Sequence, residues 1–316
     1  MAEEYDDLRD LWYPHLFSRL HVLLLRALRR HGRWGDHRPT ALDIGCGTGL
    51  QSLLLARAGA TVEAFDVAAR LVEAAERKQA AGGLDPCRPF PGYTTPHRFV
   101  RRRVLEAERL AARIRGGRPI VPARFRVADA LDVPFADASF DVVSCCGSTL
   151  SLIPDHGRAL DELARVARPG GLVVLEVEQR WNLDLVWALL DAVVGGRLGY
   201  EQDAATSWRN LTSRPSEHVR ITYPFETHTG EIDLDITLFA PAALRRELER
   251  RGVRPIEQHA IHVVTNLLPS TALHEPSPGW TTRVVFGALA RIEPAVGSLR
   301  PFRSLGCSLV VVGRRT

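Results

Sequence analysis

An α/β fold built on a parallel β-sheet is predicted by three features of the sequence. Residues 40–78 run through a short apolar strand, a glycine-containing loop, an amphipathic helix and a second strand, which is the order of a βαβ nucleotide-binding unit. Residues 138–144 form an apolar, β-branched run, as expected of a strand buried on both faces. A helical segment, 157–167, separates this run from the next apolar strand, 172–177, and such alternation is typical of parallel sheets.

The loop after the first strand carries the clearest indication of a ligand. Its three glycines, Gly45, Gly47 and Gly49, let the backbone turn tightly and approach a ligand closely. A dinucleotide fingerprint, G-x-G-x-x-G, would need its third glycine where Leu50 stands. Asp43, just ahead of the first glycine, would repel a pyrophosphate, whereas it suits a cationic ligand. The loop therefore indicates a nucleotide-like ligand that carries positive charge.

The pattern D-x-G-x-G-x-G resembles motif I of the class I S-adenosylmethionine-dependent methyltransferases. The resemblance implies S-adenosyl-L-methionine as cofactor and S-adenosyl-L-homocysteine as product. It implies that Asp43 reaches the methionine ammonium and that Asp66, after the strand 61–65, binds the ribose hydroxyls. It also implies that Asp129 accepts from the adenine amino group and that the Ala130 N–H donates to the ring. The expected cofactor-binding residues are Asp43, Gly45, Gly47, Gly49, Asp66, Val67, Asp129, Ala130 and Cys145.

The later elements continue the same pattern. The words FDVV (140–143) and RPGGLVVLEV (168–177) resemble the family's fourth and fifth strands. A helix over 241–252, a strand over 253–264 and a strand over 305–313 match its terminal reversed hairpin. The resemblance therefore implies a Rossmann-like seven-stranded sheet of order 3-2-1-4-5-7-6, with strand seven antiparallel.

Segments outside this core are expected to cover the substrate. A helical N-terminal cap, 1–37, would precede a methyltransferase domain, 38–316. Insertions are expected at 80–122, 195–240 and 265–303. The middle insertion contains two segments of alternating polarity, 217–224 and 230–239, which predict a β-hairpin lid because alternation buries one face of a strand.

The exit of the fourth strand, VSCCGSTLSLIPD (143–155), suggests the class of substrate. It resembles glycine N-methyltransferase-type small-molecule enzymes, in which Ser148 would replace an asparagine that touches the amino acid. Arg180 falls near an arginine that holds the substrate carboxylate in those enzymes, and a surface salt bridge is the alternative role. The resemblance implies methyl transfer to an N or O atom of a small organic molecule, one able to carry a carboxylate.

Methyl transfer is an in-line displacement that depends mainly on positioning, with a proton acceptor for the attacking atom. The expected catalytic residues are Tyr13, Ser148, Arg180, Tyr223 and His228, and no metal is expected. Further candidate proton acceptors are Tyr5, His15 and Glu178. The N-terminal cap and the hairpin would close the pocket against water.

Two other functions are weighed against this one. A nucleic-acid (RNA) methyltransferase is supported only by the basic insertion, where Arg98 and Arg101–Arg103 could contact phosphates or form a solvated helix face. The clamp [DNS]-P-P-[YFW] is missing after the fourth strand, and the one Pro-Cys pair, Pro86-Cys87, lies in the insertion. A non-catalytic S-adenosylmethionine-binding module is the other alternative.

Composition favours a cytoplasmic protein that acts on small molecules. The formal net charge is only +4, and Lys78 is the sole lysine. Five cysteines without C-x-x-C spacing indicate free thiols in a reducing compartment. Residues 1–10 are acidic and unlike a signal peptide, and the apolar run 20–28 is too short to span a bilayer. We expect a monomer or homodimer without nucleic-acid or membrane partners.

Overall fold

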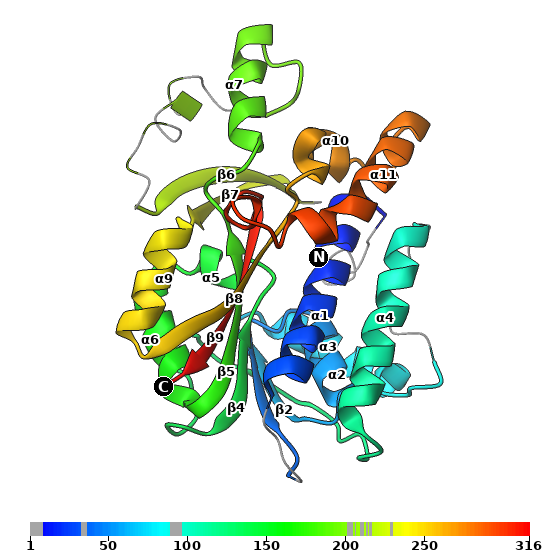
Figure 1. The fold of residues 1–316 in the computed structure, drawn as a ribbon, viewed down its shortest axis with the longest axis vertical. Coiled ribbons are helices and arrows are strands. Elements are labelled where there is room, and N and C mark those ends of the chain that lie inside the picture. The colour runs from blue at the N-terminus through cyan, green and yellow to red at the C-terminus, as the bar shows by residue number, and fades with distance from the viewer. Residues whose placement is uncertain are drawn as a thin grey trace.

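A seven-stranded mixed β-sheet with helices on both faces forms the centre of the protein (Figure 1). The computed structural model describes residues 9–32, 37–88, 97–200, 205, 207–208, 212, 214, 217–227 and 230–316, with the backbone alone for 223–227 and 230–232. The sheet order is β3-β2-β1-β4-β5-β9-β8. Its strands are β1 (Thr40–Ile44), β2 (Thr61–Asp66), β3 (Arg124–Val127), β4 (Phe140–Cys145), β5 (Ala167–Glu178), β8 (Val253–Ile261) and β9 (Ser308–Arg315).

The predicted strand order is confirmed. β9 runs antiparallel to both of its neighbours, β5 and β8, whereas β1 to β5 pair in parallel. Strands β6 and β7 form a sheet of their own, so β8 and β9 are the sixth and seventh strands of the main sheet. The order is then 3-2-1-4-5-7-6 with strand seven antiparallel, as the sequence predicts.

Two apolar cores lie on the two faces of the sheet. One contains side chains of α1, α2 and α4, and the other contains side chains of α6 and α9. The central strands contribute to both because their side chains alternate between the faces; Val142 belongs to the first core and Val143 to the second. The helices are α1 (Trp12–His31), α2 (Leu50–Arg57), α3 (Ala69–Lys78), α4 (Arg98–Arg115), α5 (Thr149–Leu152), α6 (His156–Val166), α7 (Asp184–Val194), α9 (Pro241–Arg250), α10 (Ser270–His274) and α11 (Trp280–Val296), with short turns η1 (Gln79–Gly83), η2 (Thr265–Leu267) and η3 (Phe302–Ser304).

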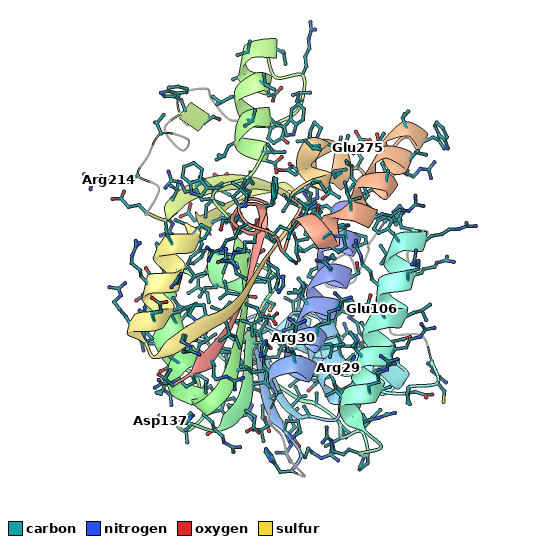
Figure 2. The ribbon with its side chains drawn as sticks, in the orientation of Figure 1. Arg29, Arg30, Glu106, Asp137, Arg214 and Glu275 are labelled. Carbon is teal, nitrogen blue, oxygen red and sulfur yellow. The ribbon has the colours of Figure 1, made fainter. Side chains whose placement is uncertain are left out.

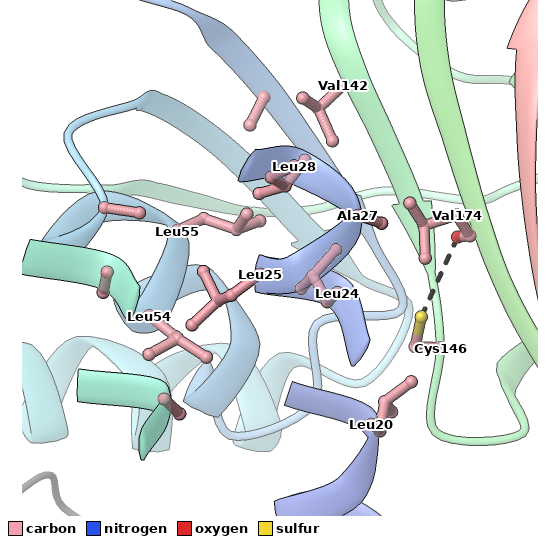
Figure 3. Packing of buried hydrophobic residues seen from close by; sticks show 14 of the residues in the cluster. Leu20, Leu24, Leu25, Ala27, Leu28, Leu54, Leu55, Val142, Cys146 and Val174 are labelled. Atoms are coloured by element: carbon pink, nitrogen blue, oxygen red, sulfur yellow. Dashed lines mark hydrogen bonds between the residues drawn. The ribbon is translucent and has the colours of Figure 1, made fainter. Parts of the chain in front are cut away.

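Helix α1 packs directly on the sheet rather than standing apart from it. Figure 3 shows Leu20, Leu24 and Leu28 of α1 among Val142 and Val174 of the central strands. Within the expected cap, 1–37, the helix runs from Trp12 to His31, and residues 1–8 and 33–36 lie outside the described part of the chain. Within that described part, no helix is both long and apolar enough to cross a bilayer.

The predicted β-hairpin is present as β6 (Val219–Thr227) and β7 (Gly230–Leu238), which pair in antiparallel register. Just after β7, Phe239 forms a parallel bridge with Gln179 at the end of β5. The Phe239 N–H donates to the Glu178 carbonyl at 2.8 Å, and the Arg180 N–H donates to the Phe239 carbonyl at 3.1 Å. The hairpin therefore crosses the carboxyl end of β5 (Figure 1).

Within the arginine-rich insertion 80–122, helix α4 packs against α1 (Figure 1). The interpretation of its arginines as a solvated helix face is wrong for Arg103, which is 9% exposed. Arg103 donates to the Nδ1 atom of His15 at 3.0 Å and to the Ala290 carbonyl at 2.6 Å. The guanidinium of Arg103 therefore links α4 to α1 and α11 through hydrogen bonds inside the protein. The insertion 265–303 is also more helical than expected, since α11 runs for 17 residues.

A carboxylate on β8 ties the end of α1 to the sheet. Glu257 accepts from Arg30 at 2.6 Å and lies 2.7 Å from His31 and 3.0 Å from His259. Hydrogen bonds from these partners, that from His259 first, lower the pKa of Glu257 to about 2. Figure 2 shows Arg30 near the exposed end of α1. Because the pKa of Glu257 is lowered in the folded protein, we expect its contribution to the free energy of unfolding to depend on pH.

We expect Glu257→Gln to lower the free energy of unfolding by about 2 kcal/mol at pH 7. The shift in pKa corresponds to about 3 kcal/mol at ~1.4 kcal/mol per unit, and solvent screening of the exposed Arg30 reduces it. Because the folded-state pKa is lowered, the contribution is complete above the ordinary value of 4.5 and is lost as pH falls toward 2. Urea unfolding at pH 7, 5 and 3.5 measures it, with Glu249→Gln on α9 as control. A difference that is equal at all three pH values would contradict the assignment.

Candidate functional site

The glycine loop after β1 adopts a conformation that needs glycine. Gly45, Gly47 and Gly49 have φ angles of 67°, 52° and 81°, in the left-handed region that side chains disfavour. A Cβ atom on Gly45 would lie 2.2 Å from Thr149, and one on Gly49 would lie 2.7 Å from Ala75. The loop therefore turns tightly between β1 and α2, with its backbone close to the loop after β4.

Asp43 anchors this loop from the end of β1. Its carboxylate is buried and accepts hydrogen bonds from Gln51 (2.8 Å), Ser52 (2.6 Å) and Ser144 (2.9 Å). Burial raises the pKa of Asp43, and these three donors oppose that effect. Through these hydrogen bonds Asp43 joins β1, α2 and β4 and supports the start of the glycine loop.

Asp66 connects the end of β2 to the same loop. One carboxylate oxygen accepts the Gly47 N–H at 2.9 Å, and the other accepts the Ala68 N–H at 2.9 Å. Each oxygen keeps a second lone pair for a ligand hydroxyl. Val67 beside it is 75% exposed. Lys78, the sole lysine, donates to the Thr48 carbonyl and hydroxyl, both at 2.9 Å, and so holds the loop from α3.

Asp129 and Ala130 follow β3, the neighbour of β2. The Ala128 N–H donates to the Asp66 carbonyl at 3.2 Å, so the two strand ends lie at the same edge of the sheet. Asp129 caps its own turn by accepting the Leu131 N–H at 2.9 Å. Ala130 is 9% exposed. The sheet thus brings Asp66, Asp129 and the glycine loop to one edge, where open α/β sheets bind ligands.

A small cavity of about 50 Å³ lies between this loop and α1. The sequence interpretation missed the residues of α1 that line it, Phe17, Leu20 and His21. Burial lowers the pKa of His21 to about 3, so this side chain is neutral near pH 7. Cys146 lines the cavity, whereas Cys145, the expected contact, points into the core on the other face of the sheet. The sequence shows that α1 is apolar along one side, but it does not show which part of the protein that side contacts. The contact between α1 and the cavity could therefore not be predicted.

Comparisons with known proteins agree with this geometry. Two family models, each described as a methyltransferase domain, match residues 41–92 and 100–175. The first range holds the glycine loop and Asp66, and the second holds Asp129 and the loop after β4. A solved S-adenosylmethionine-dependent methyltransferase from Methanosarcina mazei has the same fold, with a TM-score of 0.53 and 17% identity over 91% of this chain and 96% of that chain. The matches identify a methyltransferase domain, and the predicted recognition of a class I S-adenosylmethionine-dependent methyltransferase is confirmed.

Curated relatives of this methyltransferase share only part of their length with it. Glycine N-methyltransferase of Rattus norvegicus is 28% identical over 187 residues, which are 57% of this chain and 51% of that protein. Methyltransferase GfsG of Streptomyces halstedii is 30% identical over 195 residues, 61% and 52% of the two proteins. The chain therefore spans about half the length of these relatives. The predicted resemblance to glycine N-methyltransferase-type enzymes is confirmed.

Next to the cavity, Ser148 forms hydrogen bonds with two glutamates of β5. The Ser148 N–H donates to the Glu176 carboxylate at 2.7 Å, and its hydroxyl donates to the Glu178 carboxylate at 2.6 Å. The Glu178 N–H in turn donates to the Ser151 hydroxyl at 2.9 Å. Ser148 follows Gly147, which lines the cavity. The expected acceptor contact Ser148 therefore lies next to the expected cofactor contacts.

Arg180 is fully buried, so its alternative role as a surface salt bridge is wrong. Its guanidinium donates to the carbonyls of Arg214 at 2.6 Å and Glu217 at 2.8 Å, and it lies 4.5 Å from the centre of the Trp181 ring. It holds the chain that enters β6. The Arg214 side chain itself points outward at the edge of the molecule (Figure 2). The anchoring of a substrate carboxylate by Arg180 stays a prediction.

The remaining catalytic candidates lie in different places. Tyr13 is 38% exposed on α1, one turn before Phe17. His15 is buried against Arg103 and is remote from the cavity lining. The backbone of Tyr223 pairs with Leu234 in the hairpin, and its side chain lies outside the described atoms. Tyr5 and His228 also lie outside the described residues.

One group of possible metal ligands occurs in the described chain, away from this site. His156, His218 and Glu247 place ligand atoms within 4.8 Å of one another. The Ala240 N–H donates to Nδ1 of His218 at 3.0 Å, so Nδ1 acts as an acceptor and Nε2, which lies 3.3 Å from Glu247, is the donor. A ligating histidine has the opposite arrangement, in which the other nitrogen donates. The group is therefore arranged as a hydrogen-bonded cluster.

Proposed function

We propose that this chain transfers the methyl group of S-adenosylmethionine to an N or O atom of a small organic molecule. The observation that carries the proposal is the shared edge of the sheet. There the glycine loop lines a cavity covered by α1, and Asp66 accepts from Gly47 of that loop. Asp129 follows the neighbouring strand end, and Ser148 follows Gly147 of the cavity lining. Cofactor residues and polar acceptor residues thus follow neighbouring strands, β1 to β5.

The residues present fit the cofactor. Asp66 has a lone pair on each oxygen for a ribose hydroxyl, and the glycine loop exposes backbone groups without side chains in the way. Asp129 and Ala130 would hold the adenine. S-adenosylmethionine supplies, when bound, a methyl group that is already activated on a sulfonium. His21 is neutral beside the cavity and so does not repel a cation.

The protein's own contribution is positioning and exclusion of water. α1 covers the loop with Phe17 and Leu20, and the hairpin lies over the end of β5. We infer that the hairpin acts as the lid and that Tyr13, Tyr223 and His228 are the groups to test as further acceptor contacts. Ser148 and Glu178 offer hydrogen-bonding groups for the attacking atom between these two covers.

Asp66→Ala tests the cofactor site. We expect binding of S-adenosylmethionine to weaken by about 1–3 kcal/mol, because charge-assisted hydrogen bonds to the ribose and the support of Gly47 are lost. Calorimetry measures the change, with the exposed acid Glu73 on α3 replaced by alanine as control. NAD should show no measurable binding to the parent protein, and tight NAD binding without S-adenosylmethionine binding would refute the proposal.

Turnover separates the proposal from its alternatives. We expect S-adenosylhomocysteine to form with one or more members of a panel of small amines, alcohols and phenols. Cofactor binding without turnover across the panel would point to a non-catalytic binding module. Transfer to RNA that weakens steeply with salt would favour a nucleic-acid enzyme.

A further inference from the structure

Two glutamates at the carboxyl end of β5 form an unusual pair. Glu176 and Glu178 are two positions apart, so their side chains lie on the same face of the strand. Ser148 links them, with its N–H on Glu176 at 2.7 Å and its hydroxyl on Glu178 at 2.6 Å. Two acids are thus gathered around one residue of the loop after β4.

The loop is bent to reach them. Gly147 and Ser148 have φ angles of 71° and 58°. The left-handed region is unfavourable for serine, and such strain persists where the surroundings hold it and is frequent at functional sites. Here the two hydrogen bonds to the glutamates hold it. The strained turn lies directly beside the cavity, which Gly147 lines.

The pair lacks a compensating positive charge. Glu176 is 0% exposed, and in the described part of the chain its second oxygen has no hydrogen-bond partner. The Ser308 hydroxyl and the Gly147 N–H lie near Glu176 and favour its charged form, but both are neutral groups and burial still raises the pKa of Glu176. No ion pair between described residues reaches either carboxylate, and the charges that act on Glu178 are those of Glu176 and Asp184, both acids. A buried charge without a partner is costly, so the site favours a ligand that brings a cation.

The position suits a methyl acceptor. The backbone of Glu178 contacts the chain just after the hairpin, because its carbonyl accepts the Phe239 N–H at 2.8 Å. Ser148 lies between Glu178 and the cofactor cavity. A molecule held by the glutamates would therefore sit between that cavity and the hairpin.

We propose that Glu176 and Glu178 bind the ammonium group of an amine substrate, with Glu178 receiving the proton that this ammonium gives up before methylation. The proton moves from the ammonium nitrogen to a carboxylate oxygen of Glu178, and the nitrogen keeps the electron pair. This inference rests on the proposed function and names its substrate class. Burial and then repulsion by Glu176 raise the pKa of Glu178 to about 8 in the free protein, closer to that of an amine than an ordinary carboxylate is. The positive charge of a bound ammonium favours the carboxylate, so its binding displaces to solvent the proton that Glu178 holds near pH 7, and the carboxylate can then receive the proton of the ammonium.

Binding of matched small molecules tests the inference without turnover. The probes are 2-phenylethylamine, 2-phenylethanol and 3-phenylpropionate, together with butylamine, butanol and butyrate, titrated calorimetrically into the full chain saturated with S-adenosylhomocysteine. We expect the amines to bind at least tenfold more tightly than their alcohols and carboxylates. Carboxylates that bind as tightly as amines, or amines that do not bind, would overturn the inference.

Isosteric variants locate the effect. Glu178→Gln keeps an oxygen for the Ser148 hydroxyl and removes the charge, so amine binding should weaken at least tenfold while alcohol binding stays unchanged. Glu176→Gln, which keeps an oxygen for the Ser148 N–H, is the second variant if the first does not fold. Glu275→Gln, an exposed acid seen at the periphery in Figure 2, is the control. Unchanged amine affinity in the folded glutamate variant would overturn the inference.

Failure of the inference and failure of the proposed function are distinguishable. A parent protein that binds no S-adenosylhomocysteine contradicts the proposed function itself, and with it the inference. A protein that binds S-adenosylhomocysteine normally but prefers carboxylates contradicts only the role of the glutamate pair, and returns attention to Arg180.

Discussion

Asp43→Ala is expected to lower the free energy of unfolding by about 3 kcal/mol and to abolish measurable cofactor binding. The substitution leaves two buried donors, on Gln51 and Ser52, without their acceptor, and Ser144 keeps only its 3.2 Å hydrogen bond to the Leu42 carbonyl. Each unsatisfied buried donor costs roughly 1–3 kcal/mol, and partial relaxation reduces the sum. Because these donors lie on α2 and β4, their loss also frees the glycine loop from both neighbours. Urea unfolding and calorimetry with S-adenosylhomocysteine measure the two effects.

The variant Asp43→Asn separates the effect of the negative charge of Asp43 from the effect of the hydrogen bonds that it accepts. It keeps one carbonyl oxygen, so it should lose about half as much stability as the alanine variant and still fold. If Asp43 acts through the loop that it holds, the asparagine variant retains weakened cofactor binding. An alanine variant with parental stability and parental affinity would contradict the anchoring role that its hydrogen bonds indicate.

Arg180→Met is expected to destabilise the protein by about 2–4 kcal/mol and to loosen the chain around the hairpin. Methionine matches much of the apolar length of arginine but leaves the carbonyls of Arg214 and Glu217 without their charged donor. A hydrogen bond to a charged group contributes roughly 1.5–3 kcal/mol. We expect faster amide exchange in 217–227 and 230–240, with cofactor affinity unchanged, because the glycine loop lies at other strands.

The same variant tests the role in binding a carboxylate. If the guanidinium holds a substrate carboxylate, Arg180→Met raises the KM for that substrate while stability and amide exchange stay parental. Arg246→Met, on the outer face of α9, is the matched control for loss of an arginine. Parental exchange in the hairpin of the Arg180 variant would contradict the structural role assigned here.

Much of the fold could be predicted from local patterns. The hairpin and the glycine loop each depend on one contiguous segment, in which period-two or period-3.6 polarity and a few glycines specify the element. The sheet order joins strands that are far apart in the chain, and it was predictable only through the family resemblance that these segments carry. The candidate cofactor residues Asp43, Asp66 and Asp129 were predictable because each lies within two residues of the carboxyl end of a strand, and the parallel strands end on the same side of the sheet. Their roles toward the cofactor stay predictions.

The amino-acid sequence alone thus determined the α/β order and the class of cofactor loop, because both are encoded over short stretches of chain. Only the tertiary structure decided which side chains share the acceptor side. Ser148 meets Glu176 and Glu178 about 30 residues away, and Arg180 reaches Arg214 and Glu217 across the hairpin entry. Such contacts depend on how separate helices and strands pack against one another. The polarity pattern within one segment does not show which distant segment it contacts.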